Sequence, residues 1–163
     1  MLEIGEGTSV SPQAEISDSV RGSKIVIGKF GMIDSFVKIK PVGGNGDILI
    51  GDYCYINSGT VIFSGNGITI GNKVLIASNC SLMPVNHEYS SPASAILDQG
   101  FSESKGGIAI GDDVWIGSNS VVLDGSVVSR GCVIGAGSVV RGKLKEYGIY
   151  AGNPLVLIGT RNG

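Results

Sequence analysis

The stretch "IGDDVWIGSNSVVLDGSVVSRGCVIGAGSVVRGKLK", residues 110–145, repeats in steps of six residues. Six consecutive hexads begin with Ile or Val, at Ile110, Ile116, Val122, Val128, Ile134 and Val140. Their fifth positions are small or apolar, at Val114, Ser120, Ser126, Cys132, Ser138 and Leu144. This spacing fits neither the helical period of about 3.6 residues nor simple strand alternation, so it indicates a repeat architecture.

The six-residue period predicts one short strand and one corner in each hexad. The fifth residue of one hexad and the first of the next lie two positions apart, so in extended chain they face the same side. Cys132 and Ile134 would then face inward and Val133 outward. Residues 135–137, Gly-Ala-Gly, would turn the corner, where glycine accepts backbone angles that a β-carbon resists. Three strands and three corners, about 18 residues, close one triangular coil.

The same pattern begins again at Ile4, Ile27, Ile50 and Ile70, with phase slips at residues 22–26, 45–49 and 68–69. We therefore expect an all-β protein, a parallel β-helix shaped as a triangular prism of about seven coils. An antiparallel β-sandwich would need turns every 8 to 12 residues or so, which the strict six-residue phase does not show.

The predicted organisation is a single β-helix domain over residues 1–163. The hexads break once, and one extruded loop is expected at about residues 86–107. A short C-terminal cap is expected at about residues 146–163.

The composition limits the class of partner. A net charge of -2 over 163 residues provides no general attraction to nucleic acid or anionic lipid. The 27 glycines accompany 42% hydrophobic residues, which excludes a disordered glycine-rich chain. The first residues show no basic region followed by an apolar stretch, and no apolar run of about 18 residues is unbroken, so we expect neither a signal peptide nor a membrane-spanning helix. We expect a soluble cytoplasmic protein with a small-molecule or protein partner, without nucleic acid or stable membrane insertion.

The three cysteines, Cys54, Cys80 and Cys132, have no metal-ligand spacing, and their odd number argues against a disulfide framework. Reduced thiols in a reducing compartment are therefore expected. The sequence predicts no bound metal.

Two segments, "GGIAIGDDVWIGSNSVVLDGSVVSRGCVIGAGSVVRG" (residues 106–142) and "YAGNP" (residues 150–154), resemble the hexapeptide-repeat acyltransferases. The resemblance implies a left-handed helix and a homotrimer with active sites between subunits. The residues independently favour association, because the outward positions of the repeat are apolar at Trp115, Val121, Val127, Val133 and Val139. Stacking coils 18 residues apart would place Trp115 over Val133 and Val121 over Val139.

Within this family the chain is most similar to the sugar and xenobiotic O-acetyltransferases, which carry a histidine in an extruded loop. Here that loop is "NHEYSSPASAILDQGFSESKGG", from Asn86 to Gly107, and it contains the only histidine, His87. The resemblance implies transfer of an acetyl group from acetyl-CoA to a hydroxyl of a sugar, nucleotide sugar or polysaccharide unit. A neutral imidazole suits the general base of this reaction. Glu88 or another carboxylate of the loop is a candidate to orient the ring.

The resemblance implies further site residues. Asn57, in "YINSGT", would hold the acceptor, and Trp115 would lie beside the base and the pantetheine arm. Backbone at Ser118 and Ala136 would contact coenzyme A, where small corner residues permit close approach. Cations for the phosphates would come from the C-terminal part, at Arg141, Lys143, Lys145 and Arg161. The chain departs from the family at Arg141–Gly142, where relatives often have threonine and lysine, and at Leu155–Val156, where an arginine is usual.

Two other functions remain open from the sequence. One is an N-acetyltransferase acting on an amino sugar or its nucleotide, and the other is a catalytically silent β-helix that serves as a scaffold. A γ-type carbonic anhydrase needs three histidines for its zinc, and this chain has a single one.

Overall fold

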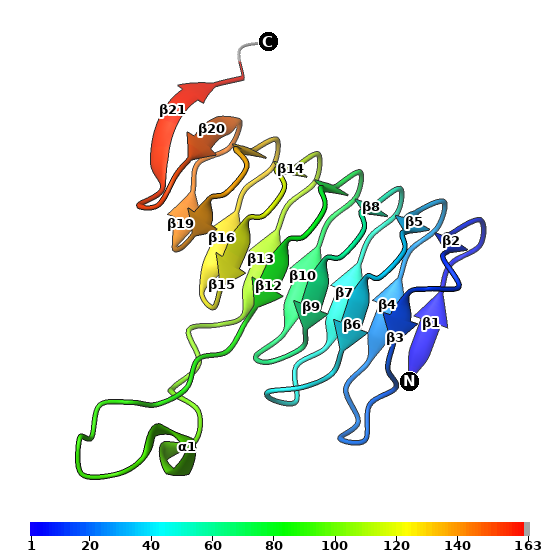
Figure 1. Ribbon diagram of the computed structural model, residues 1–163. Coiled ribbons are helices and arrows are strands. Elements are labelled where there is room, and N and C mark those ends of the chain that lie inside the picture. Colours follow the sequence, from blue (N-terminus) through cyan, green and yellow to red (C-terminus); the bar gives the residue numbers. More distant parts are fainter. Residues whose placement is uncertain (162–163) are drawn as a thin grey trace.

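The computed structural model describes residues 1–161, and the chain is a left-handed parallel β-helix, as predicted. The strands form three walls of a triangular prism, which we call walls A, B and C (Figure 1). Wall A contains β1 (Leu2–Ile4), β4 (Ile25–Ile27), β7 (Ile48–Ile50), β10 (Ile68–Ile70), β13 (Ile108–Ile110), β16 (Ser126–Val128) and β19 (Lys143–Leu144). Its seven strands confirm the expected number of coils.

The other two walls follow in each coil. Wall B contains β2 (Ser9–Val10), β5 (Met32–Ile33), β8 (Tyr55–Ile56), β11 (Leu75–Ile76), β14 (Trp115–Ile116), β17 (Val133–Ile134), β20 (Gly148–Ala151) and, antiparallel at its end, β21 (Val156–Thr160). Wall C contains β3 (Glu15–Ile16), β6 (Lys38–Lys40), β9 (Val61–Phe63), β12 (Ser81–Met83), β15 (Val121–Leu123) and β18 (Val139–Val140).

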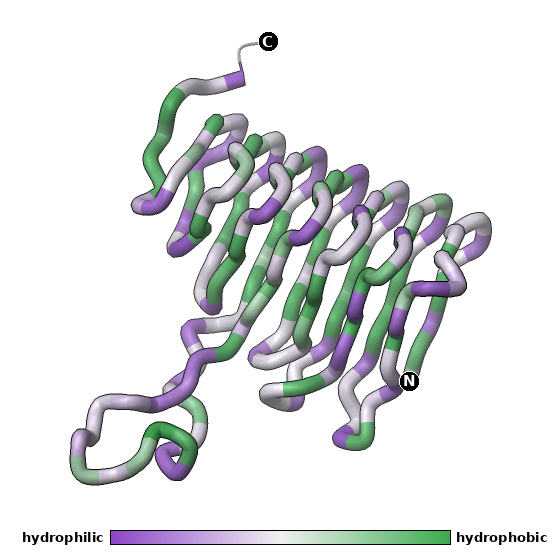
Figure 2. Tube along the Cα trace, in the orientation of Figure 1, coloured by the Kyte–Doolittle hydropathy of each residue, from purple (hydrophilic) through white to green (hydrophobic). Residues whose placement is uncertain are grey.

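The core is a column of branched aliphatic side chains along the prism axis. Every first and fifth position of the hexads in residues 110–145 is buried, which confirms the predicted inward faces. The parallel register places Trp115 beside Val133 and Val121 beside Val139, also as predicted. Figure 2 shows hydrophobic residues along the strands and hydrophilic ones at the corners.

The edge between walls C and A takes up the extra residues of the longer coils. Residues 17–24, 41–47 and 64–67 bulge there, and each is followed by a three-residue strand of wall A (Figure 1). The predicted slips at residues 22–26, 45–49 and 68–69 are therefore placed a few residues too late, and partly inside strands. The reason is that wall A strands face inward at both ends, as at Ile48 and Ile50, so the core pattern resumes two residues earlier.

The largest bulge, residues 84–107, is the extruded loop, and it begins two residues earlier than the predicted boundary. It projects from the prism and carries the short helix α1 (Ile96–Gln99) near its far end (Figure 1). Near the prism its two limbs form an antiparallel ribbon, in which the Ser102 and Glu88 amides donate to the Asn86 and Gly100 carbonyls, respectively, at 2.9 and 3.0 Å.

At the C-terminal end, β20 still belongs to the last coil because it pairs in parallel with β17. The cap proper is β21, which folds back antiparallel on β20. No helix within residues 1–161 is long and apolar enough to cross a membrane.

Candidate active site

His87 lies on the outgoing limb of the extruded loop, where it pairs with Phe101 of the return limb. The imidazole is exposed and rests against the Phe101 ring, with ring centroids 5.0 Å apart and planes inclined by 43°. Among the described residues the ring makes no hydrogen bond. Its nitrogens are therefore available to a ligand.

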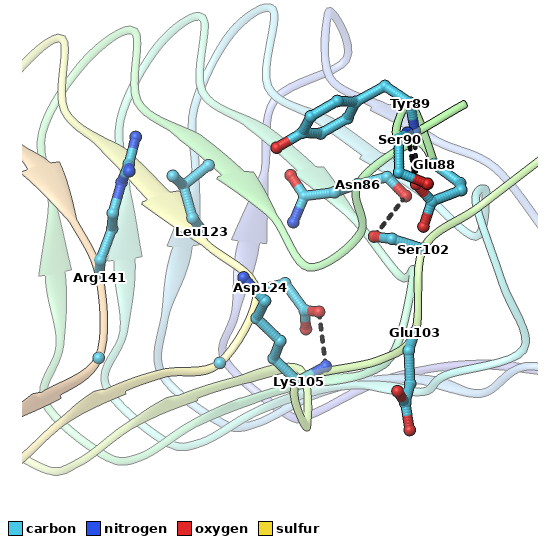
Figure 3. A pocket seen from close by; sticks show the side chains of 12 residues that line it. Asn86, Glu88, Tyr89, Ser90, Ser102, Glu103, Lys105, Leu123, Asp124 and Arg141 are labelled. Carbon is cyan, nitrogen blue, oxygen red and sulfur yellow. Dashed lines mark hydrogen bonds between the residues drawn. The ribbon is translucent and has the colours of Figure 1, made fainter. Parts of the chain in front are cut away.

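A cavity of about 790 Å³ lies between the extruded loop and the C-terminal coils. Figure 3 shows Arg141 and Leu123 on the prism side, Tyr89 and Asn86 on the loop side, and Asp124 between them. The full lining is Asn86, Glu88, Tyr89, Ser90, Ser102, Glu103, Lys105, Leu123, Asp124, Gly125, Arg141 and Gly142.

His87 does not line this cavity, although both of its neighbours do. Because successive residues of an extended ribbon face opposite sides, Asn86, Glu88 and Ser102 face the cavity while His87 and Phe101 face away. Within one chain the cavity and the imidazole therefore lie on opposite faces of the loop.

Glu88 does not orient the imidazole through a hydrogen bond. Its Oε1 atom accepts from the Tyr89 and Ser90 amides at 2.8 and 2.7 Å. These bonds, that of Ser90 first, hold the pKa of Glu88 below its ordinary value. The carboxylate stabilises the turn after His87, and the structure does not support the hypothesis that Glu88 aligns the ring.

The predicted acceptor and pantetheine residues lie elsewhere on the prism. Asn57 is on the edge between walls B and C, where its Nδ2 donates to the Ile76 carbonyl at 2.8 Å. Ser118 and Ala136 lie on successive corners of the same edge. The two corners are linked by the Gly137 amide, which donates to the Ser118 carbonyl at 2.8 Å. Trp115 faces outward from wall B and is 50% exposed.

The predicted phosphate-binding cations do not form one cluster. Arg141 is exposed beside the cavity, on the edge between walls C and A, and its guanidinium has no partner among residues 1–161. Arg161 lies on the edge between walls A and B, where its Nη1 contacts Asp113 Oδ2 at 2.9 Å and the Gly131 carbonyl at 3.1 Å. Lys143 is on wall A, and Lys145 is on the corner that follows it.

Several cavity residues were not predicted from the sequence. Tyr89, Glu103 and Lys105 belong to a loop without periodicity, so nothing in the pattern indicated which of its side chains would meet the prism. Asp124 stands in an Asp-Gly pair, which is typical of an ordinary turn. In the structure, however, the Asp124 carboxylate is buried.

No group of three or more His, Cys, Asp or Glu side chains within residues 1–161 is arranged to hold a metal ion. All three cysteines are buried and free, and burial raises their thiol pKa values.

A triangular prism built from six-residue repeats defines the class of hexapeptide-repeat β-helix proteins. Comparison with known proteins agrees, since residues 107–142 match the family described as bacterial transferase hexapeptide (six repeats). A Saccharomyces cerevisiae protein named as an acetyltransferase, YJL218W, is 32% identical over 162 residues, which cover 96% of this chain and 78% of the yeast protein. The chain therefore belongs to the hexapeptide-repeat acyltransferase family.

Two bacterial relatives are longer than this chain. Rv3034c of Mycobacterium tuberculosis, named as an acetyltransferase, is 30% identical over 99% of this chain and 50% of its own length. WbbJ of Escherichia coli, named as an O-acetyl transferase of lipopolysaccharide biosynthesis, is 36% identical over 73% of this chain and 63% of its own length. The chain thus spans between half and two thirds of these two relatives.

A solved structure shares the fold. A variant of AntD, an N-acyltransferase from Bacillus cereus, in complex with dTDP-4-amino-4,6-dideoxyglucose and coenzyme A, superposes with a TM-score of 0.83. The two are 26% identical, and the match covers 99% of this chain and 84% of AntD.

Proposed function

We propose that this protein transfers an acetyl group from acetyl-CoA to a hydroxyl of a sugar, nucleotide sugar or polysaccharide unit, with His87 as the general base. The observation that carries the proposal is the placement of the chain's only histidine. It is exposed on the large loop extruded from the prism and has no hydrogen-bonding partner among residues 1–161. The similarity to WbbJ, named as an O-acetyl transferase, supports a hydroxyl acceptor.

The reaction assigns distinct tasks to the residues of this chain. Acetyl-CoA would supply the thioester. His87 would accept the proton of the acceptor hydroxyl while the hydroxyl oxygen forms the ester bond to the acetyl carbon. The thiolate of coenzyme A would leave as the C–S bond breaks and would take up this proton from the imidazolium. A neutral imidazole near pH 7 has the basicity for this step, and such a base contributes about 10²- to 10⁴-fold to the rate. The Phe101 ring contacts the imidazole on one side, with ring centroids 5.0 Å apart. Within residues 1–161 no serine, threonine or cysteine side chain is hydrogen-bonded to His87, so we propose direct attack by the acceptor without a covalent acyl-enzyme.

The described residues fit coenzyme A in two ways. Arg141 provides a cation at the cavity that is free to pair with a phosphate, and guanidinium groups bind phosphate through paired N–H donors. The small corner residues Ser118 and Ala136 leave backbone accessible to a narrow pantetheine arm. Arg161 is a weaker candidate, since a phosphate would have to compete with Asp113 for its guanidinium.

The separation of these residues favours a homotrimer with composite sites. Asn57, Ser118 and Ala136 line the edge between walls B and C, whereas the loop with His87 belongs to the edge between walls C and A. A neighbouring subunit that presents one edge to the other would bring the two sets together. The exposed apolar side chains of wall B, Tyr55, Leu75 and Trp115, favour such burial.

A second candidate is N-acylation of an amino sugar. It is favoured by AntD, which shares the fold over nearly the whole chain and was solved with a 4-amino sugar nucleotide. The two candidates differ in the bond formed, because mild alkali cleaves an acetyl ester but leaves an acetamide intact.

The test is a screen of matched hydroxyl and amino sugars and their nucleotides with acetyl-CoA, following release of the free thiol. Wild type should release thiol with a hydroxyl acceptor and form an alkali-labile product. His87→Ala should lose about 10²- to 10⁴-fold in kcat while it still binds coenzyme A in calorimetry. Ser94→Ala, an exposed change in the same loop, is the matched control and should match wild type.

Three results would contradict the proposal. Full activity of His87→Ala would show that His87 is not the general base. An alkali-stable product would indicate an amino sugar as the acceptor. Absence of coenzyme A binding by wild type would favour the silent scaffold.

A further inference from the structure

Asp124 is the only buried charged side chain in the described part of the chain, with 7% of its surface exposed. Within residues 1–161 its carboxylate forms no ion pair. Its Oδ2 atom accepts from the Lys105 amide at 2.8 Å and from Asn66 Nδ2 at 3.2 Å, and its Oδ1 atom accepts from the Gly107 amide at 2.8 Å. Figure 3 shows the bond to Lys105 at the floor of the cavity. Three N–H donors thus compensate for the removal of this carboxylate from water.

All three donors lie at the root of the extruded loop, which is the part where its two limbs join the prism. Lys105 and Gly107 belong to its return limb, while Asn66 belongs to the preceding coil on the same edge. The backbone amide of Asn66 also donates to the carbonyl of Pro84, where the outgoing limb begins, at 3.0 Å. Asp124 from one side and Asn66 from the other therefore enclose the root and hold both limbs.

The return limb in turn determines where His87 lies. Among the described residues, the backbone of the outgoing limb from Asn86 to Glu88 is hydrogen-bonded to the return limb and not to the prism. The bonds join Asn86 to Ser102 and Glu88 to Gly100, and His87 itself faces Phe101. A displacement of the return limb at Lys105 would therefore also displace the outgoing limb and the imidazole of His87.

We propose that Asp124 is a positioning residue for His87, which fixes the angle at which the extruded loop leaves the prism and so the place of the imidazole. This inference rests on the proposed function. An asparagine at this position has nearly the same shape, but its NH₂ group would face one of the backbone N–H donors, so the root would lose one bond and gain a repulsion.

The experiment compares Asp124→Asn with Asp52→Asn, a matched change at a partly exposed corner, where Asp52 accepts from the Lys29 amide at 2.7 Å. Asp124→Asn should lower kcat by about 100-fold, as expected for a base displaced by about 1 Å, with the KM for acetyl-CoA changed less than about twofold. Hydrogen exchange of the loop amides should accelerate in Asp124→Asn alone. Asp52→Asn should behave as wild type.

Two further variants keep the inference testable. Asn66→Ala removes one donor and leaves the carboxylate, so it should lower kcat in the same direction but less. In a His87→Ala background, Asp124→Asn should cause no further loss, because a residue that acts only through the imidazole has no effect once the imidazole is gone.

Wild-type kcat in Asp124→Asn would overturn the inference, and so would equal losses of kcat, coenzyme A affinity and thermal stability, which indicate general destabilisation. An additive loss in the double variant would also overturn it. Full activity of His87→Ala, by contrast, would refute the proposed function itself. An inactive His87→Ala beside a fully active Asp124→Asn would refute only the role of Asp124.

Discussion

The imidazole of His87 packs on the ring of Phe101 from the opposite limb of the extruded loop, with centroids 5.0 Å apart. It is the only ring contact of the histidine among the described residues, and the imidazole makes no hydrogen bond there. We therefore expect Phe101→Ala to reduce kcat by about tenfold through a less restricted imidazole, with little effect on the KM for acetyl-CoA. Phe101→Tyr keeps the ring and should retain activity. Steady-state kinetics test this prediction. Equal kcat values for wild type and Phe101→Ala would show that the Phe101 ring does not support the imidazole.

Arg141 and Arg161 should differ in what they affect. Arg141→Ala should raise the KM for acetyl-CoA by about tenfold, because its guanidinium is free for a phosphate, and the effect should shrink at high salt. Arg161→Ala should instead lower the melting temperature by a few degrees at most, since its exposed pair with Asp113 is screened by solvent. Kinetics and thermal denaturation of both variants separate these roles. An unchanged KM in Arg141→Ala would exclude it from the coenzyme site.

The apolar outer face of wall B should be required for association. Light scattering of the wild type should give about three times the chain mass of 16.7 kDa. Leu75→Glu, on the outer face of β11, should yield an inactive monomer with unchanged circular dichroism. Thr69→Glu, in β10 on wall A of the same coil, is the control and should remain trimeric. A fully active monomeric Leu75→Glu would refute composite sites.

Core substitutions should destabilise the prism strongly. Ile116 and Ile134 stack in neighbouring coils and are fully buried, so truncation of either to alanine should lower the free energy of unfolding by about 2–5 kcal/mol. Val20→Ala, at a position 97% exposed, should leave stability within about 0.5 kcal/mol of wild type. Thermal denaturation at fixed protein concentration measures both. If Ile134→Ala lowered the free energy of unfolding by less than about 1 kcal/mol, the prediction would be wrong, because the surrounding core would have rearranged to fill the cavity.

The turn after His87 should depend on pH through Glu88. Its pKa is lowered in the folded protein, so its carboxylate stabilises the turn above the ordinary value of 4.5, and this contribution is lost as pH falls through the lower folded value. NMR titration of the Tyr89 and Ser90 amides should therefore show a midpoint below 4.5. Glu88→Gln should abolish this transition. A midpoint at or above 4.5 in wild type would mean that the two bonds do not persist in solution.

Most of the fold was predictable because each inward position repeats in the coil above. Ile116, for instance, packs between Ile76 and Ile134, and each of these occupies the first position of its hexad. The boundaries of the bulges were predicted less well. Ile25 and Ile48 face inward before their hexads formally begin, so the core resumes earlier than the phase suggested.

The site was predictable only in part. The single histidine and the break in the repeat indicated the extruded loop and its imidazole. The separation of Arg161 from Arg141 depends instead on the fold-back of β21, and the buried role of Asp124 depends on where a non-repeating loop returns to the prism. Neither arrangement depends on residues that are close in sequence, so neither follows from a period of six.

The edge between walls C and A accepts connections as short as residues 124–125 and as long as residues 84–107, while the neighbouring strands keep their pairing. The length of the connection is thus independent of the packing of the core beneath it. This edge is a natural position for exchanging whole loops between related chains, so substrate preference could diverge, or be redesigned, without rebuilding the interior that supports it.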